Sequence, residues 1–266
     1  ALCKYYEAVA PLLLPYLHGR ICPLVAAKTG RKLWPLPDWT PSWVRTAVVP
    51  RGNEEVRGAI VEDLDTLLFL LEAGCGSLLM TPVREESPAA ADFVALRIAG
   101  EKAWRAALAA RALVEATGLA AFAKTAGAGA YDVLVPVGDA PADGVHVLGA
   151  LFVRLLAHDA ALHGATVETL DAPVAPWAVA LPVAPGGSAH ASMPMTWDEA
   201  EDETRASSRL DHVLGHVLGH LRERMAAGAI DDPMRGMLEA KVDFGRAVAA
   251  IETMIGSSFV RDPRAR

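Results

Sequence analysis

Residues 120–137 read Ala-Ala-Phe-Ala-Lys-Thr-Ala-Gly-Ala-Gly-Ala-Tyr-Asp-Val-Leu-Val-Pro-Val. The small residues around Gly127-Ala128-Gly129 predict a tight turn, and the apolar, β-rich run at 131–137 predicts a strand directly after it. Backbone N–H groups in such a turn can form a concave anion-binding site. The alternative is that the small residues only preserve the turn.

Outward from this stretch, the hydrophobic pattern alternates between strand-like and helix-like segments. Apolar, β-rich runs predict strands at 21–26, 44–49, 92–98, 131–137 and 165–170. Helical periodicity predicts helices at 2–17, 62–74, 101–117, 146–163, 198–227 and 233–255. This alternation predicts an α/β (α+β) fold.

Length and composition are those of one enzyme-sized domain. The chain has 266 residues, of which 52% are hydrophobic and 21% charged, which argues against disorder. No uncharged apolar run reaches the length of about 20 residues that a membrane helix needs. Three scattered cysteines are too few for a disulfide framework or a zinc site. We therefore expect a cytoplasmic protein that does not enter a membrane.

The stretch at 120–137 resembles the phosphate-binding segment of the polymerase domains of bacterial end-joining DNA ligases (the LigD type), which belong to the archaeo-eukaryotic primase superfamily. The family form is roughly Lys-Thr-Ser-Gly-x-Lys-Gly-x-His followed by a strand. The Ser, Lys and His positions are here occupied by Ala126, Gly129 and Asp132. The resemblance thus covers the scaffold of the segment and not its phosphate-binding side chains.

The resemblance continues in the same order across about residues 2–200. The matching blocks lie at 5–11, 14–20, 41–46, 62–68, 175–177, 182–185 and 194–199. It implies a primase-like domain over residues 1–200, with central mixed sheets flanked by helices and without the usual N-terminal extension. Residues 201–266 would form a helical part packed on the same domain. Because the sequence opens at Ala1, directly on the family's first helix, we expect further residues upstream.

The family carries a Phe-Asp-Leu-Asp-Pro segment whose two aspartates hold the catalytic metals. The matching positions here are Ala95 and Arg97. An Asp-x-Asp pair on a strand places two carboxylates on one face, where they can share divalent cations. Ala95 offers no ligand, and Arg97 brings a permanent positive charge. Two interpretations remain open for Arg97: it fills the former cation position, or it faces solvent from the end of a strand.

The family's third metal carboxylate precedes an Ala-Pro-Tyr block, and Glu168 or Asp171 could be its remnant. A lone carboxylate on a sheet is more often solvated than a ligand. Displaced carboxylates at Asp92, Glu168 and Asp171 are the alternative by which the chain would remain active with Mn²⁺ or Mg²⁺. Strand alternation places Asp92 on the face opposite Ala95, which argues against that alternative.

The phosphate-binding segment has lost most of its donors. Ser, Lys and His bind phosphate oxygens through charge-assisted hydrogen bonds, and Asp132 is expected to add a repelling carboxylate. Lys124 and Thr125 persist from the family pattern. Lys124 could be a residual anion contact, or else a surface lysine ahead of a turn.

One feature is not part of the family pattern. His212, His216 and His220 are spaced by four residues, so they would lie on one stripe of a helix, where a pair four residues apart can bind Zn²⁺. The alternative is an ordinary packed helix flanked by histidines. Glycines between the histidines indicate a close helix–helix contact, within one chain or between two subunits.

Charge argues against strong DNA binding. The net charge is −7 and the isoelectric point about 5.6, whereas counterion release requires a cationic face. We therefore expect a degenerate LigD-polymerase-like protein without nucleotidyltransferase activity and without a cofactor. It would act as a binding or assembly component linked to DNA repair, with a protein partner or a second copy. The alternative is an active template-dependent DNA/RNA primase-polymerase.

Overall fold

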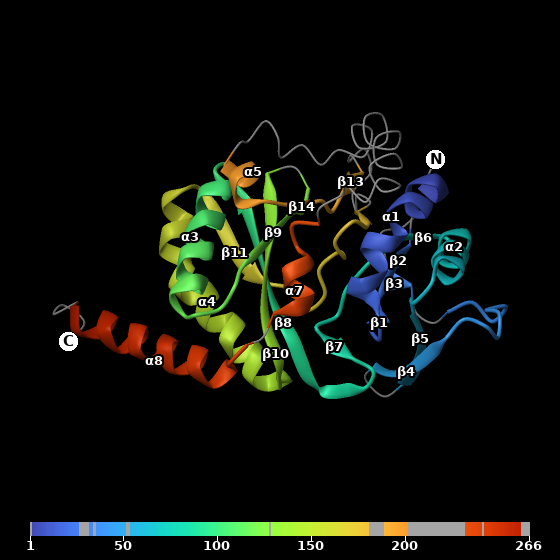
Figure 1. Cartoon of the computed structure of the whole chain (residues 1–266), viewed down its shortest axis with the longest axis horizontal. Coiled ribbons are helices and arrows are strands. Elements are labelled where there is room, and N and C mark those ends of the chain that lie inside the picture. The colour runs from blue at the N-terminus through green and yellow to red at the C-terminus, as the bar shows by residue number, and fades with distance from the viewer. Residues whose placement is uncertain are drawn as a thin grey trace.

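The computed structural model describes residues 2–26, 32–33, 36–51, 54–127, 129–180, 189–201, 232–240 and 242–261. Figure 1 shows a central sheet with long helices on one side and a smaller unit of helices and short sheets on the other. The helices are α1 (Leu2–Leu17), α2 (Leu64–Glu72), α3 (Ala103–Ala116), α4 (Ala142–Leu162), α5 (Trp197–Glu201), α7 (Arg235–Glu239) and α8 (Phe244–Arg261). The expected α+β class is confirmed.

The largest sheet has the strand order β11-β8-β10-β9-β14, and β7 pairs with an outer part of β8. These strands are β7 (Val83–Arg84), β8 (Ser87–Gly100), β9 (Phe122–Thr125), β10 (Ala130–Pro141), β11 (Ala165–Thr169) and β14 (Pro194–Met195). Every strand pair in the described ranges is antiparallel, whereas the family resemblance implied mixed sheets.

Three smaller sheets lie on the side of the molecule that carries α1 and α2 (Figure 1). Their strand orders are β1-β5-β4, β3-β2-β6 and β12-β13. Their bounds are β1 (Ile21–Cys22), β2 (Leu24–Ala26), β3 (Lys32–Leu33), β4 (Thr46–Arg51), β5 (Glu54–Ile60), β6 (Cys75–Leu78), β12 (Val179–Ala180) and β13 (His190–Ala191).

The large sheet separates two hydrophobic cores. On β8, Leu96 and Ile98 belong to the core under α3 and α4, whereas Phe93 and Ala95 belong to the core that includes α1 and α2. This division follows from the period of two in a strand, which sends successive side chains to opposite faces. The face opposite α3 and α4 is the one that carries the candidate site.

Helix α4 covers the sheet closely. A Cβ at Gly149 would lie 2.9 Å from Cγ2 of Thr169 on β11, so the absence of a side chain there permits the approach of helix to sheet. By length and hydropathy alone α4 could cross a membrane. Its buried residues, among them Leu148 and Phe152, belong to the core under α3 and α4.

The chain segment at 232–239 packs on the site face of the sheet. Met234 and Met237 are buried in the same core as α1, and Tyr16 donates a hydrogen bond to Asp232 (2.7 Å). A Cβ at Gly236 would lie 3.2 Å from the ring of Phe122 on β9. The helix predicted at 233–255 is in fact two helices: α7 ends at Glu239, and α8 begins at Phe244.

Candidate functional site

A row of four charged side chains crosses the large sheet. In the strand register Glu168 of β11 lies opposite Arg97 of β8, Arg97 lies opposite Asp132 of β10, and Asp132 lies opposite Lys124 of β9. Directly opposed residues in antiparallel strands project to the same face. The charges therefore alternate in sign across the sheet, on the face away from α3 and α4. We call these four residues the charge row.

Asp132 is the centre of the charge row. Nε and Nη2 of Arg97 donate to its two carboxylate oxygens at 2.8 and 3.0 Å, and Nζ of Lys124 donates to the same carboxylate. Asp132 and Lys124 are fully buried, while the side chain of Arg97 is 28% exposed. The contact between Arg97 and Asp132 is bidentate, the geometry in which an Arg–carboxylate pair is strongest.

The electrostatics of the charge row favour the ionised form of Asp132. Burial alone would raise the pKa of the Asp132 carboxyl, but the charges and hydrogen bonds of Lys124 and Arg97 lower it below its ordinary value. Burial lowers the pKa of the Lys124 ammonium, and Asp132 opposes that shift. The repelling carboxylate expected at Asp132 is thus neutralised by two cations.

The residues retained from the phosphate-binding segment have structural partners. Lys124 is completely buried, so its interpretation as a surface lysine is wrong. The Thr125 hydroxyl donates to the carbonyl oxygen of Ala191 (3.0 Å) and accepts from the amide of Met193 (2.9 Å). Both side chains therefore help to hold β9 within the fold.

The turn between β9 and β10 has the expected tight geometry. The amide of Ala126 donates to Ala130 (3.0 Å), and the amide of Ala130 donates to Gly127 (3.2 Å). Gly127 and Gly129 have positive φ angles of 117° and 68°, which only glycine adopts readily. The proposed anion-binding backbone includes Ala128, which lies outside the described residues.

At the two positions that match the family's metal-binding aspartates in the sequence, the structure has one apolar and one ion-paired side chain. Ala95 is 2% exposed, and its carbonyl oxygen accepts from the amide of Leu170 (2.9 Å). Arg97 turns toward Asp132 instead of projecting freely into solvent. Its positively charged guanidinium lies on the site face of the sheet, and in the strand register Arg97 stands between Asp132 and Glu168. Glu168 is exposed at the end of the row.

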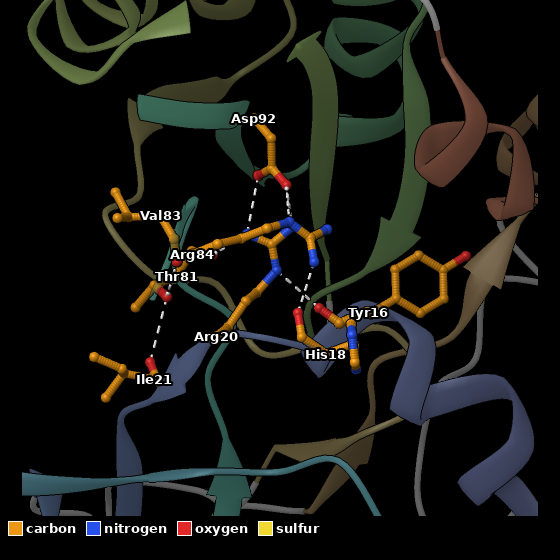
Figure 2. Close-up of polar contacts among 8 residues, drawn as sticks. All are labelled: Tyr16, His18, Arg20, Ile21, Thr81, Val83, Arg84 and Asp92. Atoms are coloured by element: carbon orange, nitrogen blue, oxygen red, sulfur yellow. Dashed lines mark hydrogen bonds and ion pairs between the residues drawn. The ribbon is translucent and has the colours of Figure 1, made fainter. Parts of the chain in front are cut away.

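Asp92 is held by two arginines that the sequence analysis did not identify as a site. Nη1 of Arg20 donates to Oδ1 of Asp92 (2.9 Å), its Nη2 donates to Oδ2, and Nε of Arg84 donates to Oδ2 at 3.1 Å. Figure 2 shows both guanidinium groups directed at this carboxylate. Arg20 is 1% exposed, so the Asp92 carboxylate is held in an ion pair with a buried guanidinium.

A cleft of about 800 Å³ lies beside Ala95, between the end of β11, the region of β7 and helix α4. Most of its lining is apolar, including Phe93, Val94 and Leu170. Of the two carboxylates considered as remnants, Asp171 lines this cleft and is exposed, whereas Glu168 does not line it. His212, His216 and His220 lie outside the described residues.

This fold is shared with a solved polymerase domain. The polymerase domain of Mycobacterium tuberculosis Ligase D, in a structure determined in complex with DNA, superposes with a TM-score of 0.72 and 18% sequence identity. The similarity covers 90% of this chain and 91% of that one. No curated protein matches the sequence.

A sequence-family comparison extends this result from fold to family. The model of the LigD primase-polymerase domain matches residues 1–169. The chain therefore belongs to the LigD primase-polymerase domain family, as the sequence analysis indicated.

Proposed function

We propose that this chain is a LigD polymerase-like protein that lacks nucleotidyl transfer and acts as a binding or assembly component linked to DNA repair. The observation that carries the proposal is the ion pair of Arg97 with Asp132. It puts a guanidinium at one metal-ligand position and a neutralised carboxylate at the phosphate-binding histidine position.

The side chains present do not fit the metal ions of the family reaction. Nucleotidyl transfer by two divalent cations requires carboxylates that clamp both ions. Ala95 supplies no oxygen ligand, and the positive charge of Arg97 opposes cation binding. Within the described ranges, no group of three or more His, Cys, Asp or Glu side chains is arranged to hold a metal ion.

Displaced carboxylates are the second candidate, and they are poorly placed to act together. Asp92 forms ion pairs with Arg20 and Arg84. Glu168 lies opposite the Arg97 cation. Asp171 is the one of the three that lines the cleft beside Ala95, and a single carboxylate does not clamp two ions.

Primer extension distinguishes these two functions. Purified protein with Mn²⁺, a primer-template and either ribo- or deoxynucleoside triphosphates should give no product, while a known polymerase under the same conditions does. Asp171→Ala and Glu168→Ala variants are assayed in parallel. Template-dependent extension by the wild type that either substitution abolishes would contradict our proposal and support displaced metal ligands.

The proposed assembly role is tested by measuring the molecular mass of the protein in solution and its affinity for DNA. We propose a protein partner or a second copy of the chain, and we expect only weak DNA binding. The net charge is −7, and both cations of the charge row are paired with Asp132. Sedimentation measures the oligomer, and a DNA duplex titrated at two salt concentrations measures the electrostatic affinity. Tight, salt-dependent DNA binding would contradict this part of the proposal.

A further inference from the structure

Two consecutive turns with the pattern Pro-x-Trp-x present a pair of tryptophans. Residues 37–40 and 41–44 each form a four-residue turn that begins with proline and has tryptophan in its third position. The amide of Thr40 donates to Pro37 (2.9 Å), and the amide of Val44 donates to Pro41 (3.1 Å). Val44 is buried in the core and anchors the second turn. The repeat therefore supports both indole rings from a defined backbone.

Both indole rings contact Phe69 of α2. The centroid of the Phe69 ring is 5.3 Å from that of Trp39 and 5.9 Å from that of Trp43, with interplanar angles of 78° and 76°. Phe69 is 7% exposed, whereas Trp39 and Trp43 are 59% and 55% exposed. Large aromatic side chains so exposed, and held by edge contacts, are typical of binding surfaces.

Two carboxylates, those of Asp65 and Glu72, lie beside the tryptophans. A hollow of about 660 Å³ is lined by Trp39, Pro41, Trp43, Asp65, Leu68, Phe69 and Glu72. Asp65, Phe69 and Glu72 have helical spacings that put them on one face of α2. Within the described part of the chain, neither Asp65 nor Glu72 has an ion-pair partner. We call this site the tryptophan hollow.

We propose that the tryptophan hollow binds an arginine or lysine side chain from a basic segment of a partner protein. A cation within about 6 Å of an indole ring is attracted by the π electrons, and Asp65 and Glu72 add charge attraction to the same cation. A nucleic acid could stack bases on the tryptophans, but the two carboxylates repel its phosphates. The hollow lies away from the charge row, so this inference does not depend on whether the chain catalyses nucleotidyl transfer.

The test uses a fluorescein-labelled hexa-arginine peptide and measures fluorescence anisotropy with the full chain. The wild type should bind the peptide. Trp39→Ala, Trp43→Ala and the double variant Asp65→Asn/Glu72→Gln should each weaken binding by about five-fold or more, because each removes cation–π or ionic attraction. Trp39→Phe retains an aromatic ring and should bind within about two-fold of wild type.

The matched control separates this site from general attraction to an acidic protein. Asp159→Asn/Glu252→Gln removes the same number of charges from exposed positions on α4 and α8 and should leave the affinity unchanged. An equal loss in this control, or wild-type affinity in both Trp→Ala variants, would overturn the proposal. So would binding of single-stranded oligothymidylate that the Trp→Ala variants lose while peptide binding persists. Thermal unfolding is measured for Asp65→Asn/Glu72→Gln to show that this variant folds. The peptide affinity of this variant then tests the proposal even if a tryptophan variant does not fold.

Discussion

Arg97 and Asp132 face each other on neighbouring strands, and two hydrogen bonds of 2.8 and 3.0 Å join guanidinium to carboxylate. By the resemblance to the family pattern, Arg97 stands at a metal-ligand position and Asp132 at a phosphate-ligand position. Under our proposal, these two substitutions each remove a ligand and compensate each other in charge.

Asp132 should be essential for stability. In Asp132→Asn, Lys124 keeps its charge in a fully buried position without a carboxylate partner. We expect a loss of about 3–5 kcal/mol in the free energy of unfolding, the usual cost of breaking a buried ion pair from one side. Urea unfolding measures it. Glu115→Gln, which removes the exposed i, i+4 pair with Arg111, is the control and should cost less than about 1 kcal/mol. Equal losses in the two variants would contradict the prediction.

The same carboxylate should make stability depend on acidic pH. The pKa of Asp132 is lower in the folded protein than its ordinary value. Its contribution is therefore complete above the unfolded pKa of about 3.9, and is lost as the pH falls through the lower folded pKa. Between about pH 4 and pH 2 the wild type should lose more unfolding free energy than Asp132→Asn does. Parallel curves for the two proteins in this range would show that Asp132 is not a paired ion.

Nucleotide affinity should be low. The family's Ser, Lys and His donors are replaced by Ala126, Gly129 and Asp132, and a hydrogen bond to a charged group contributes about 1.5–3 kcal/mol. We expect triphosphate dissociation constants in the millimolar range or weaker in titration calorimetry with Mn²⁺. A micromolar constant would mean that other residues form a nucleotide pocket, and Asp171→Ala would then report on the cleft beside Ala95.

Two glycines of α4 should respond differently to alanine. A Cβ at Gly149 would come within 2.9 Å of Thr169, whereas a Cβ at Gly144 would meet the Phe244 ring at 3.4 Å. Replacing glycine by alanine inside a helix normally stabilises it by about 1 kcal/mol. We expect Gly144→Ala to raise the melting temperature and Gly149→Ala to lower it, because overpacking opposes the gain in helix propensity. A rise in both variants would show that the contact with Thr169 relaxes freely.

The long, strongly apolar elements were predictable from the sequence, and the short polar ones were not. All five predicted strand segments contain strands, because runs such as 131–137 are apolar and rich in β-branched residues. Strand β9 was missed, since Phe-Ala-Lys-Thr has neither a clear alternation nor a high β propensity. Missing β9 hid the pairing of Lys124 with Asp132, because only the hairpin register brings these residues together.

Contacts between distant parts of the chain explain the remaining differences. The pair of Arg20 and Asp92 spans 72 residues, and no local pattern reports such a separation. Ala95 and Arg97 lie on one strand, as predicted, because the apolar run at 92–98 forms part of β8. The ion-pair partner of Arg97 could not be predicted, because it is set by the strand that pairs with β8. That strand is β10, and its place in the sheet is decided by the tertiary fold.

The charge row also restricts how the sheet can assemble. A shift of β10 by one residue along β8 would turn Asp132 toward the apolar helices α3 and α4 and leave Val133 among the charges. The same shift of β9 would bury the Lys124 ammonium without a counter-ion. Strand misalignment is thus costly at each step across the sheet. The charge row can therefore select one alignment of β9, β10 and β8 during folding, and a row of carboxylates with like charge would do so less well.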